Sequence, residues 1–343
     1  MKTLAHLLFG CLTITATDAR DLTFLSTSDS HYRENDHKQG HHNDLIRASV
    51  IEMNRMHEES WPQELGGGPI AKPQGLLMPG DLIDDGDHLR NGRNVTREQF
   101  GMFVRDFGLD GSDGLLTIPV FEGFGNHDGP PVGSEKHGFS TQAMIIERNR
   151  IRKEKGLISH VSANGLHYSW DWEDVHFVQL NIYPADAQHE SVRYSPVWHD
   201  PQDALSFLKL DLAEKVGRSG RPVVIAAHCG FDTNWWCEED WKAFHQVVEP
   251  YQLVLYLFGH TGTGIGKWAP DEGTKPIHWI NDGHTDVGFF VIRITDDRLR
   301  AAYRVKTGLT ASKGKDGKKV HAWDGGWGWK FLVDRPLKPQ PAE

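Results

Sequence analysis

Residues 117–131, TIPVFEGFGNHDGPP, place a short apolar run directly before Asn126, His127 and Asp128. The run reads as a buried strand, and the Gly and Pro residues that follow it mark a loop. Polar side chains in this position stand at the carboxyl end of a strand, which is where open α/β sheets bind their ligands. The stretch therefore indicates a functional site on loops at the edge of a sheet.

The same arrangement recurs at four other places along the chain. The five segments are TSDSHY (27–32), with Asp29 and His31; MPGDLIDDGD (78–87), with Asp81 and Asp84; GFGNHDGP (123–130); AAHCG (226–230), with His228; and FGHTG (258–262), with His260. A lone His or Asp after a strand is usually a structural residue. Five strand ends that all carry oxygen or imidazole donors predict one shared metal site.

Between these segments the sequence alternates strands with helices. Apolar periodicity predicts helices over about 44–58, 141–154 and 202–216, the first with Asn43 as a candidate N-cap. Residues 166–172 and 175–183 read as a hairpin, and so do 286–295 and 296–305. Strand–helix alternation mixed with hairpins predicts an α/β fold with mixed sheets.

The order D-x-H, GD, GNHD, H and GH resembles the signature of the calcineurin-like metallophosphoesterase superfamily over about residues 21–305. The segments HYSWDWEDVHFVQLN (167–181) and RPVVIAAHCG (221–230) are similar to connecting segments of that family. The resemblance implies a four-layer αββα sandwich, in which two mixed sheets are flanked by helices. It also implies a phosphoric ester hydrolase, either a metallophosphatase or a phosphodiesterase.

The resemblance further implies a centre of two divalent metal ions (Mn, Fe, Zn or Mg) about 3.5–4 Å apart, whose bridging hydroxide attacks phosphorus in line. The implied ligands of the first metal are Asp29, His31 and Asp81. Those of the second are Asp81, Asn126, His228 and His260. Asp81 matches the carboxylate that bridges the two metals in this family.

His127 matches a family residue that contacts the phosphoryl group or the leaving oxygen, as an acid or as an electrostatic stabiliser. Such a His needs an orienting carboxylate on its other ring nitrogen. Asp84 is the first candidate, because GDLIDDG (80–86) resembles the GDxxDxG segment of Ser/Thr protein phosphatases. Asp128 is the second candidate.

The sequence departs from the family at one ligand. Many members end in GHxH, whereas here Gly262 stands where the second His would be. Three outcomes stay open for the first metal. Water fills the position; another His replaces it, such as His284 or one of His37, His41 and His42; or the first site is weak.

The sequence says little about the substrate. Arg33, Arg90 and Arg93 lie close in sequence to the predicted metal loops and are candidates for clamping a phosphate, Arg33 first. Asn126 is expected to contact substrate as well as metal. Trp235 and Trp236 follow the His228 loop, either as an aromatic wall for a substrate group or as packing of the loop itself.

The composition narrows the partners. The 343 residues include 37 Lys and Arg, 47 Asp and Glu and 20 His, for a net charge of −10. This acidic balance disfavours nucleic acid as a general partner. It does not exclude a small phosphorylated substrate, because bound metals invert the local field.

The ends differ in composition from the middle of the chain. Residues 1–19 read as a signal peptide, which predicts a periplasmic or secreted protein, and no later run reaches the about 18 apolar residues of a membrane span. Residues 20–310 form the predicted catalytic domain, and 311–343 a Trp-, Gly- and Pro-rich extension. In an exported chain Cys229 and Cys237 could pair. The oligomeric state is left open.

The leading hypothesis is a metal-dependent phosphoester hydrolase that acts on a monoester or a diester. The alternative is a weak or inactive member of the same fold that serves as a binding or scaffold module. A third hypothesis adds surface recognition through the Trp-rich extension to the catalytic domain.

Overall fold

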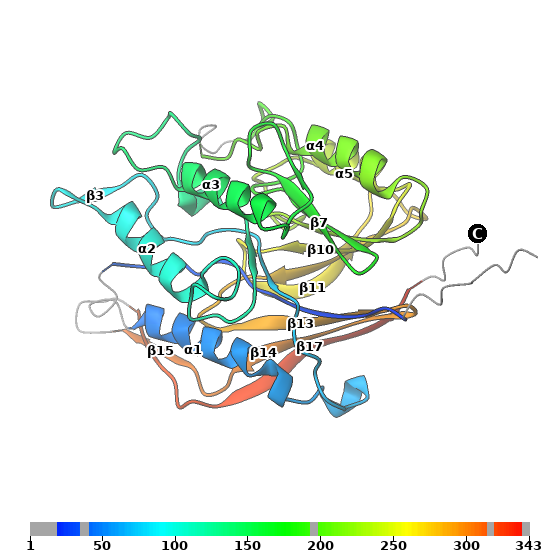
Figure 1. Ribbon diagram of the computed structural model, residues 1–343, viewed down its shortest axis with the longest axis horizontal. Helices are drawn as coiled ribbons and strands as arrows, with labels where there is room; N and C mark the ends of the chain where they lie inside the picture. Colours follow the sequence, from blue (N-terminus) through cyan, green and yellow to red (C-terminus); the bar gives the residue numbers. More distant parts are fainter. Residues whose placement is uncertain (1–18, 35–40, 193–197, 314–318, 338–343) are drawn as a thin grey trace, which may run out of the picture.

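The computed structural model describes residues 19–34, 41–192, 198–313 and 319–337, and two large mixed sheets form its centre (Figure 1). The predicted signal peptide lies outside this range except for Ala19. The first sheet has the order β17-β14-β13-β1-β2-β5 and the second the order β11-β12-β10-β9-β8-β7-β6. This mixed α/β architecture of two sheets flanked by helices confirms the predicted fold class.

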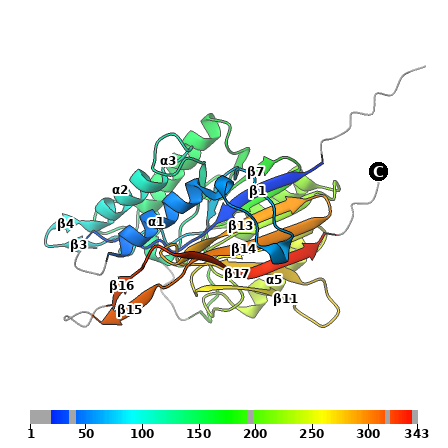
Figure 2. The ribbon, with the colours of Figure 1, turned by 90° about the horizontal axis from the view of Figure 1, so that it is seen from below.

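Three neighbouring strands of the first sheet are parallel, and the other three run antiparallel to their neighbours. Its strands are β17 (Trp327–Pro336), β14 (Arg298–Lys306), β13 (Gly288–Thr295), β1 (Asp21–Ser26), β2 (Leu76–Met78) and β5 (Val120–Glu122). Figure 2 shows β1, β13, β14 and β17 side by side in that order. The predicted hairpin that joins β13 to β14 is confirmed.

The second sheet has four parallel strands at its centre and antiparallel strands at both edges. Its strands are β11 (Thr263–Trp268), β12 (Ile277–Asp282), β10 (Gln252–Phe258), β9 (Pro222–Ala226), β8 (Val175–Gln179), β7 (Tyr168–Trp172) and β6 (His160–Val161). The hairpin β7–β8 turns at Glu173, whose φ is 53°, as the sequence predicts.

The described residues form five α-helices, which flank the sheets (Figure 1). They are α1 (His42–Asn54), α2 (Val95–Phe107), α3 (Thr141–Glu154), α4 (Ala204–Asp211) and α5 (Glu238–Val248). The caps explain two of the starts, because Asn94 Oδ1 accepts from Arg97 N and Ser140 Oγ accepts from Ala143 N. Short helical turns complete the chain at Met56–Glu58, Gln63–Leu65, Asn126–Asp128 and Leu212–Val216.

Alternation along the strands divides the core into two parts. Leu22 and Phe24 of β1 point between the sheets, whereas Leu25 points toward the helices. Between the sheets, Phe121 of β5 stacks on Trp170 of β7 with ring centroids 4.3 Å apart. This inter-sheet packing holds the carboxyl ends of both sets of parallel strands at one edge of the sandwich.

Two sequence expectations need correction. The first helix begins at His42 and ends at Asn54, and Asn43 is not its N-cap but bonds through its side chain to the backbone of Arg33. His57, which the predicted range 44–58 places in that helix, is exposed on the separate turn Met56–Glu58.

The C-terminal extension does not lie apart from the body of the molecule. Its strand β17 pairs with β14 from Lys306↔Trp327 to Arg298↔Pro336. Cations of β14 lie over its indole rings, with Arg304 5.0 Å from the Trp329 centroid and Lys306 4.4 Å from that of Trp327. Two small hairpins, β3 (Leu89–Arg90) with β4 (Arg93–Asn94) and β15 (Thr310–Lys313) with β16 (Lys319–Ala322), project from the body (Figures 1 and 2).

Two further expectations concern the membrane and the thiols. Within the described ranges, no helix combines the length and apolar character that crossing a bilayer requires. Cys229 and Cys237 are both free thiols rather than a disulfide, with Cys229 buried.

Candidate functional site

The five predicted strand ends meet at one edge of the sandwich. Side chains from the loops after β1, β2, β9 and β10 form two groups whose ligand-type atoms lie within 4.8 Å of one another and which share Asp81. One group is Asp29, His31 and Asp81, and the other is Asp81, His228 and His260. Beside them, His31, Asp84 and His127 form a third group of the same kind. The position of Asp81 in the first two groups is the arrangement expected for a bridging carboxylate.

The distances within these groups are short. His31 Nε2 lies 3.4 Å from Asp29 Oδ1 and 3.6 Å from Asp81 Oδ2. On the other side, His228 Nε2 lies 3.2 Å from the same Asp81 Oδ2 and 3.0 Å from Asn126 Oδ1. All six predicted ligands therefore lie together, although each comes from a strand end distant in sequence.

The backbone at this edge is unusual. Asp29, His31, Asp81 and His260 all have left-handed backbone, with φ of 53°, 45°, 53° and 68°. Residues other than Gly rarely adopt this conformation, and strained residues of this kind concentrate at functional sites. Four of the six predicted ligands share it, so the loops are shaped to direct these side chains toward one point.

Two glycines let the loops approach one another closely. A Cβ on Gly125 would collide with Asp81 Oδ1, and one on Gly259 would collide with the carboxylate of Asp29. The short distance also allows a bond between loops, since His260 N donates to Asp29 Oδ2 at 2.8 Å. Glycine at these two positions of the GNHD and GH motifs is therefore required by packing.

The carboxylates strongly affect the imidazoles. Burial lowers the pKa of His31, but Asp29, Asp81 and Asp84 outweigh burial and raise that pKa to about 9. Burial raises the pKa of Asp29, yet His31 and His228 bring it down to about 2. The negative potential that raises the pKa of His31 is one that also attracts divalent cations.

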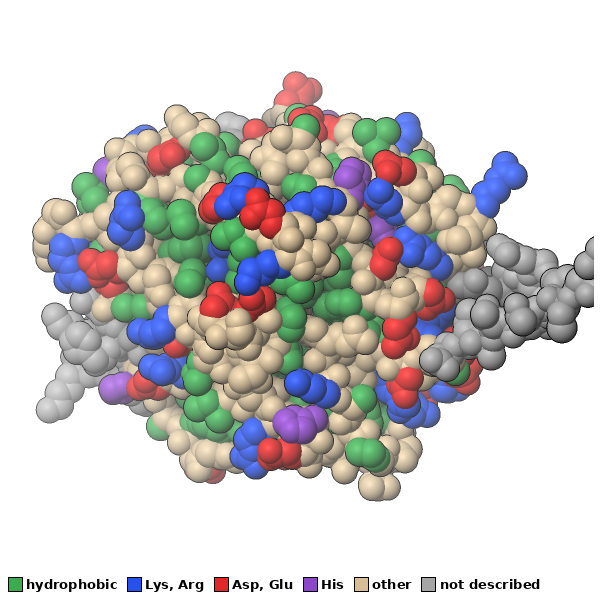
Figure 3. Space-filling view, viewed as in Figure 1, with side chains coloured by type: hydrophobic (Ala, Val, Ile, Leu, Met, Phe, Trp, Pro, Cys, Tyr) green, Lys and Arg blue, Asp and Glu red, His purple; other side chains and the backbone are tan. Residues whose placement is uncertain are grey.

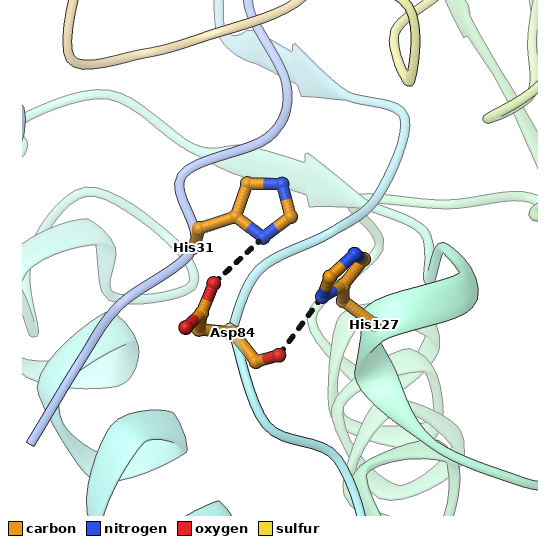
Figure 4. Close-up of side chains that lie close together, drawn as sticks. All are labelled: His31, Asp84 and His127. Atoms are coloured by element: carbon orange, nitrogen blue, oxygen red, sulfur yellow. Dashed lines mark hydrogen bonds and ion pairs between the residues drawn. The ribbon is translucent and has the colours of Figure 1, made fainter. Parts of the chain in front are cut away.

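His127 lies beside these groups and is held by Asp84, but not through the carboxylate. The His127 Nδ1 bonds to the main-chain oxygen of Asp84 at 2.8 Å (Figure 4). The Asp84 carboxylate instead faces His31 Nδ1 at 3.6 Å and Arg33 Nε at 3.4 Å. The orienting carboxylate expected for His127 is thus replaced by a backbone carbonyl, which fixes Nδ1 as the protonated nitrogen.

Asp128, the second candidate for that role, has a different partner set. Its Oδ1 accepts from Leu82 N and Ile83 N, and its Oδ2 accepts from Gly125 N at 2.7 Å. This buried carboxylate fastens the Asp81 loop to the Asn126 loop. Asp128 therefore supports the position of His127 without contacting its ring.

The three arginines that are candidates for binding a phosphate lie in different positions relative to the candidate site. Arg33 lies next to the site through Asp84. Arg90 pairs with Glu34 and Asp85, and Arg93 pairs with Glu98. Among the three, Arg33 alone contacts a residue of the predicted site in the described structure, and its role toward substrate stays a prediction.

In the described structure, none of the histidines proposed as replacements for the missing second His belongs to the groups of metal-ligating side chains. His42 bonds to Ser30 O and faces Asp286, His41 is exposed beside Asp44, and His284 influences Asp286 electrostatically. His37 lies outside the described residues. Gly262 itself has a φ of 137°, so a His there would be strained.

The two tryptophans after His228 differ. Trp235 lies at the site, with its ring centroid 4.3 Å from that of His260. Trp236 is buried, and its indole N–H donates to Gly230 O. The aromatic-wall interpretation therefore fits Trp235, and the packing interpretation fits Trp236.

Sequence reasoning missed Asn181, which follows β8 and forms a sixth strand end. This buried residue has a φ of 61°, and its main-chain oxygen accepts from His228 N. Its side chain accepts from Phe124 N at 3.0 Å and donates to Leu166 O and His167 Nδ1. Asn181 thereby joins the loop of Asn126 to the loop of His228, and its only sequence signal is an Asn that follows an apolar strand.

The buried His167 behind Asn181 makes stability depend on pH. It bonds to Gln202 O, and burial lowers its pKa to about 4, compared with about 6.5 in the unfolded chain. Between pH 6.5 and 4 the unfolded chain binds more protons at this residue than the folded chain does. The free energy of unfolding therefore decreases as the pH is lowered through that window. The loss from this residue reaches about 2–3 kcal/mol at pH 4.5.

We expect His167→Gln to remove that part of the pH dependence. Urea unfolding of metal-stripped protein at pH 7.5 and 4.5 measures it, with the exposed His137→Gln as the matched control. The wild type and His137→Gln should lose more free energy of unfolding than His167→Gln. Equal losses in all three proteins would show that His167 does not stay neutral in the fold.

Comparisons with known proteins bear on the fold alone. No protein-family model and no curated protein matches the sequence. Among solved structures, GAP50, the anchor in the inner membrane complex of Plasmodium, aligns over 94% of this chain and 90% of its own with a TM-score of 0.50 and 10% identity. The Haemophilus influenzae NAD nucleotidase NadN aligns over 89% of this chain with a TM-score of 0.43 and 11% identity, and this chain covers 54% of its length.

Proposed function

We propose that this chain is a metal-dependent phosphoester hydrolase. The observation that carries the proposal is the position of Asp81, whose carboxylate lies between His31 on one side and His228 on the other. A carboxylate shared by two groups of nitrogen and oxygen donors is what a two-metal hydrolytic site requires. The calcineurin-like motif order in the sequence supports the same class.

The buried polar atoms of the site fit divalent cations. Asp29 is buried, and its Oδ1 has no hydrogen-bond partner in the described structure. His31 Nε2 lies 3.4 Å from this oxygen. A buried carboxylate oxygen that accepts no hydrogen bond is costly, and a cation would offset that cost. The proposed ligands are Asp29, His31 and Asp81 for one ion and Asp81, Asn126, His228 and His260 for the other, with water in the place of the missing second His.

The chain's own residues are proposed to position the substrate and move a proton. Two divalent ions at this site would supply an activated water and neutralise charge on the phosphoryl oxygens. In the reaction a water oxygen bonds to phosphorus in line with the departing group, and the bond from phosphorus to the ester oxygen breaks. His127, held through Nδ1, presents Nε2 to give that leaving oxygen a proton.

A small phosphorylated substrate fits the charge distribution. On the face shown in Figure 3, acidic and basic side chains are interspersed rather than segregated. With the net charge of −10, this supports a small ester rather than a nucleic-acid backbone as the general partner. Arg33 and Asn126 are the proposed phosphate contacts, and export through the 1–19 segment is part of the same proposal.

Metal removal tests the proposal. Protein stripped by a chelator should lose turnover of p-nitrophenyl phosphate or of its bis ester, and refilling with Mn, Fe, Zn or Mg should restore it. The choice between the two substrates will assign monoester or diester preference. Turnover that survives complete metal removal would contradict the mechanism, and no turnover with any metal would contradict the enzyme assignment.

The second candidate function is a binding or scaffold module with little or no turnover. Gly262 in place of a usual ligand favours it, and a protein of similar fold, GAP50, is described as an anchor. Metal binding without turnover of either substrate class would support this candidate over the hydrolase.

A further inference from the structure

A cavity of about 340 Å³ opens beside the candidate site. The described residues that line it are Asn126, His127, Trp198 and His199. Its size lies within the range of about 300–1,000 Å³ that is usual for small-molecule sites. Two lining residues therefore come from the GNHD loop, and the other two, which form a second wall, come just before α4 in the sequence.

His199 of the second wall is the first of three neighbouring rings. The ring centroid of His199 lies 4.0 Å from that of Trp235, and Trp235 in turn lies 4.3 Å from His260. His260 is a candidate metal ligand, so aromatic surface extends from the cavity to the metal groups. None of the described lining residues is a carboxylate, so the cavity suits an uncharged ring better than a cation.

The position of His127 shows which part of a substrate the cavity would receive. His127 is proposed to give a proton to the leaving oxygen, so the group attached to that oxygen lies on the His127 side of phosphorus. The cavity is on that side, because His127 lines it. The phosphoryl group would then stay with Asp81 and the metal groups while the ester group enters the cavity.

We propose that this cavity selects phosphoesters whose ester group carries a planar aromatic ring, and that Trp198 stacks on that ring. The proposal rests on the hydrolase function proposed above and names its substrate class. Indole rings bind flat rings through offset stacking. Trp198 is thus a specificity-determining residue, with His199 and Trp235 as the continuing wall.

Matched esters test the proposal. Benzyl phosphate and cyclohexylmethyl phosphate both release a primary alcohol, so they differ in aromatic character more than in leaving-group chemistry. If the enzyme prefers diesters, the methyl diesters of the same two alcohols are used instead. Trp198→Ala should lower kcat/KM for the benzyl ester about tenfold, the size expected for one stacked ring, and that for the cyclohexylmethyl ester by less than about twofold. Trp198→Phe should keep most activity on the benzyl ester.

The controls separate the outcomes. Trp329→Ala, on the edge strand β17, should change neither substrate, and thermal unfolding will show whether each variant is folded. If Trp198→Ala lowers kcat/KM equally for both esters, stacking is overturned. A larger loss of kcat/KM on ribose 5-phosphate than on the benzyl ester would also overturn it and would indicate a sugar site. Wild-type protein that turns over no ester with any metal would instead overturn the proposed function, and the substrate class with it.

Discussion

Turnover by the metal-loaded protein will fall by about 10³-fold or more when Asp81 is replaced by asparagine, and bound metal will fall with it. The carboxylate of Asp81 lies 3.6 Å from His31 Nε2 and 3.2 Å from His228 Nε2. Asparagine keeps the shape and the acceptor for His127 N, but it removes the negative charge from the point that both groups share. Both predicted ion sites therefore lose the negative charge of their shared ligand in one substitution.

The measurement pairs metal analysis with kinetics on the preferred ester. Asp87→Asn is the matched control, because Asp87 is a carboxylate of the same loop that accepts from Lys136 N and His137 N. The control should keep metal and turnover close to wild type. Asp81→Asn protein that retains the full metal content and full activity would show that this carboxylate holds no ion.

The sequence predicts well which strands form and which side chains meet at their ends, because both depend on local pattern. The apolar runs before Asp29, Asp81, Asn126, His228 and His260 all form strands or extended segments that end at one edge of the sandwich. A buried strand followed by a polar loop residue is visible within ten residues of sequence. The convergence of five such ends then follows from the general rule for α/β sheets.

The partner of His127 could not be predicted, for a physical reason. Its Nδ1 bonds to the backbone oxygen of Asp84, and every residue has a backbone oxygen, so residue type carries no signal. The Asp84 side chain, which the motif does suggest, pairs with His31 and Arg33 instead. The motif thus identified the correct residue and the wrong atoms.

Long-range contacts account for most of the other differences. The strand β17 is rich in Trp and charge rather than in β-branched apolar residues, and its pairing with β14 depends on Arg304 and Lys306 lying over its indole rings. Such pairing is a property of the neighbouring strand and not of the segment itself. Trp198 is similar, because its place in the cavity wall depends on its position relative to Asn126 and His127, which are distant in sequence.

His127→Ala should lower kcat by about 10²–10⁴-fold while metal content stays unchanged. His127 is absent from both groups that Asp81 joins but forms a third group with His31 and Asp84, and its ring centroid lies 4.5 Å from that of His31. Because Nδ1–H donates to Asp84 O, Nε2 carries a transferable proton only when the imidazole is charged. Loss of this proton donor slows departure of the ester oxygen without removing a proposed ligand.

The leaving group shows whether His127 acts as that acid. A p-nitrophenolate leaves readily without a proton, whereas an alkyl alcohol needs one, so His127→Ala should lose more activity on an alkyl ester than on the matching p-nitrophenyl ester. His137→Ala, an exposed His of the following loop, is the control and should leave both rates unchanged. Equal losses on both esters would assign His127 to electrostatic stabilisation of the phosphoryl group. If His127→Ala instead loses metal, His127 belongs among the ligands, because its imidazole then binds a metal ion as well as carrying a proton.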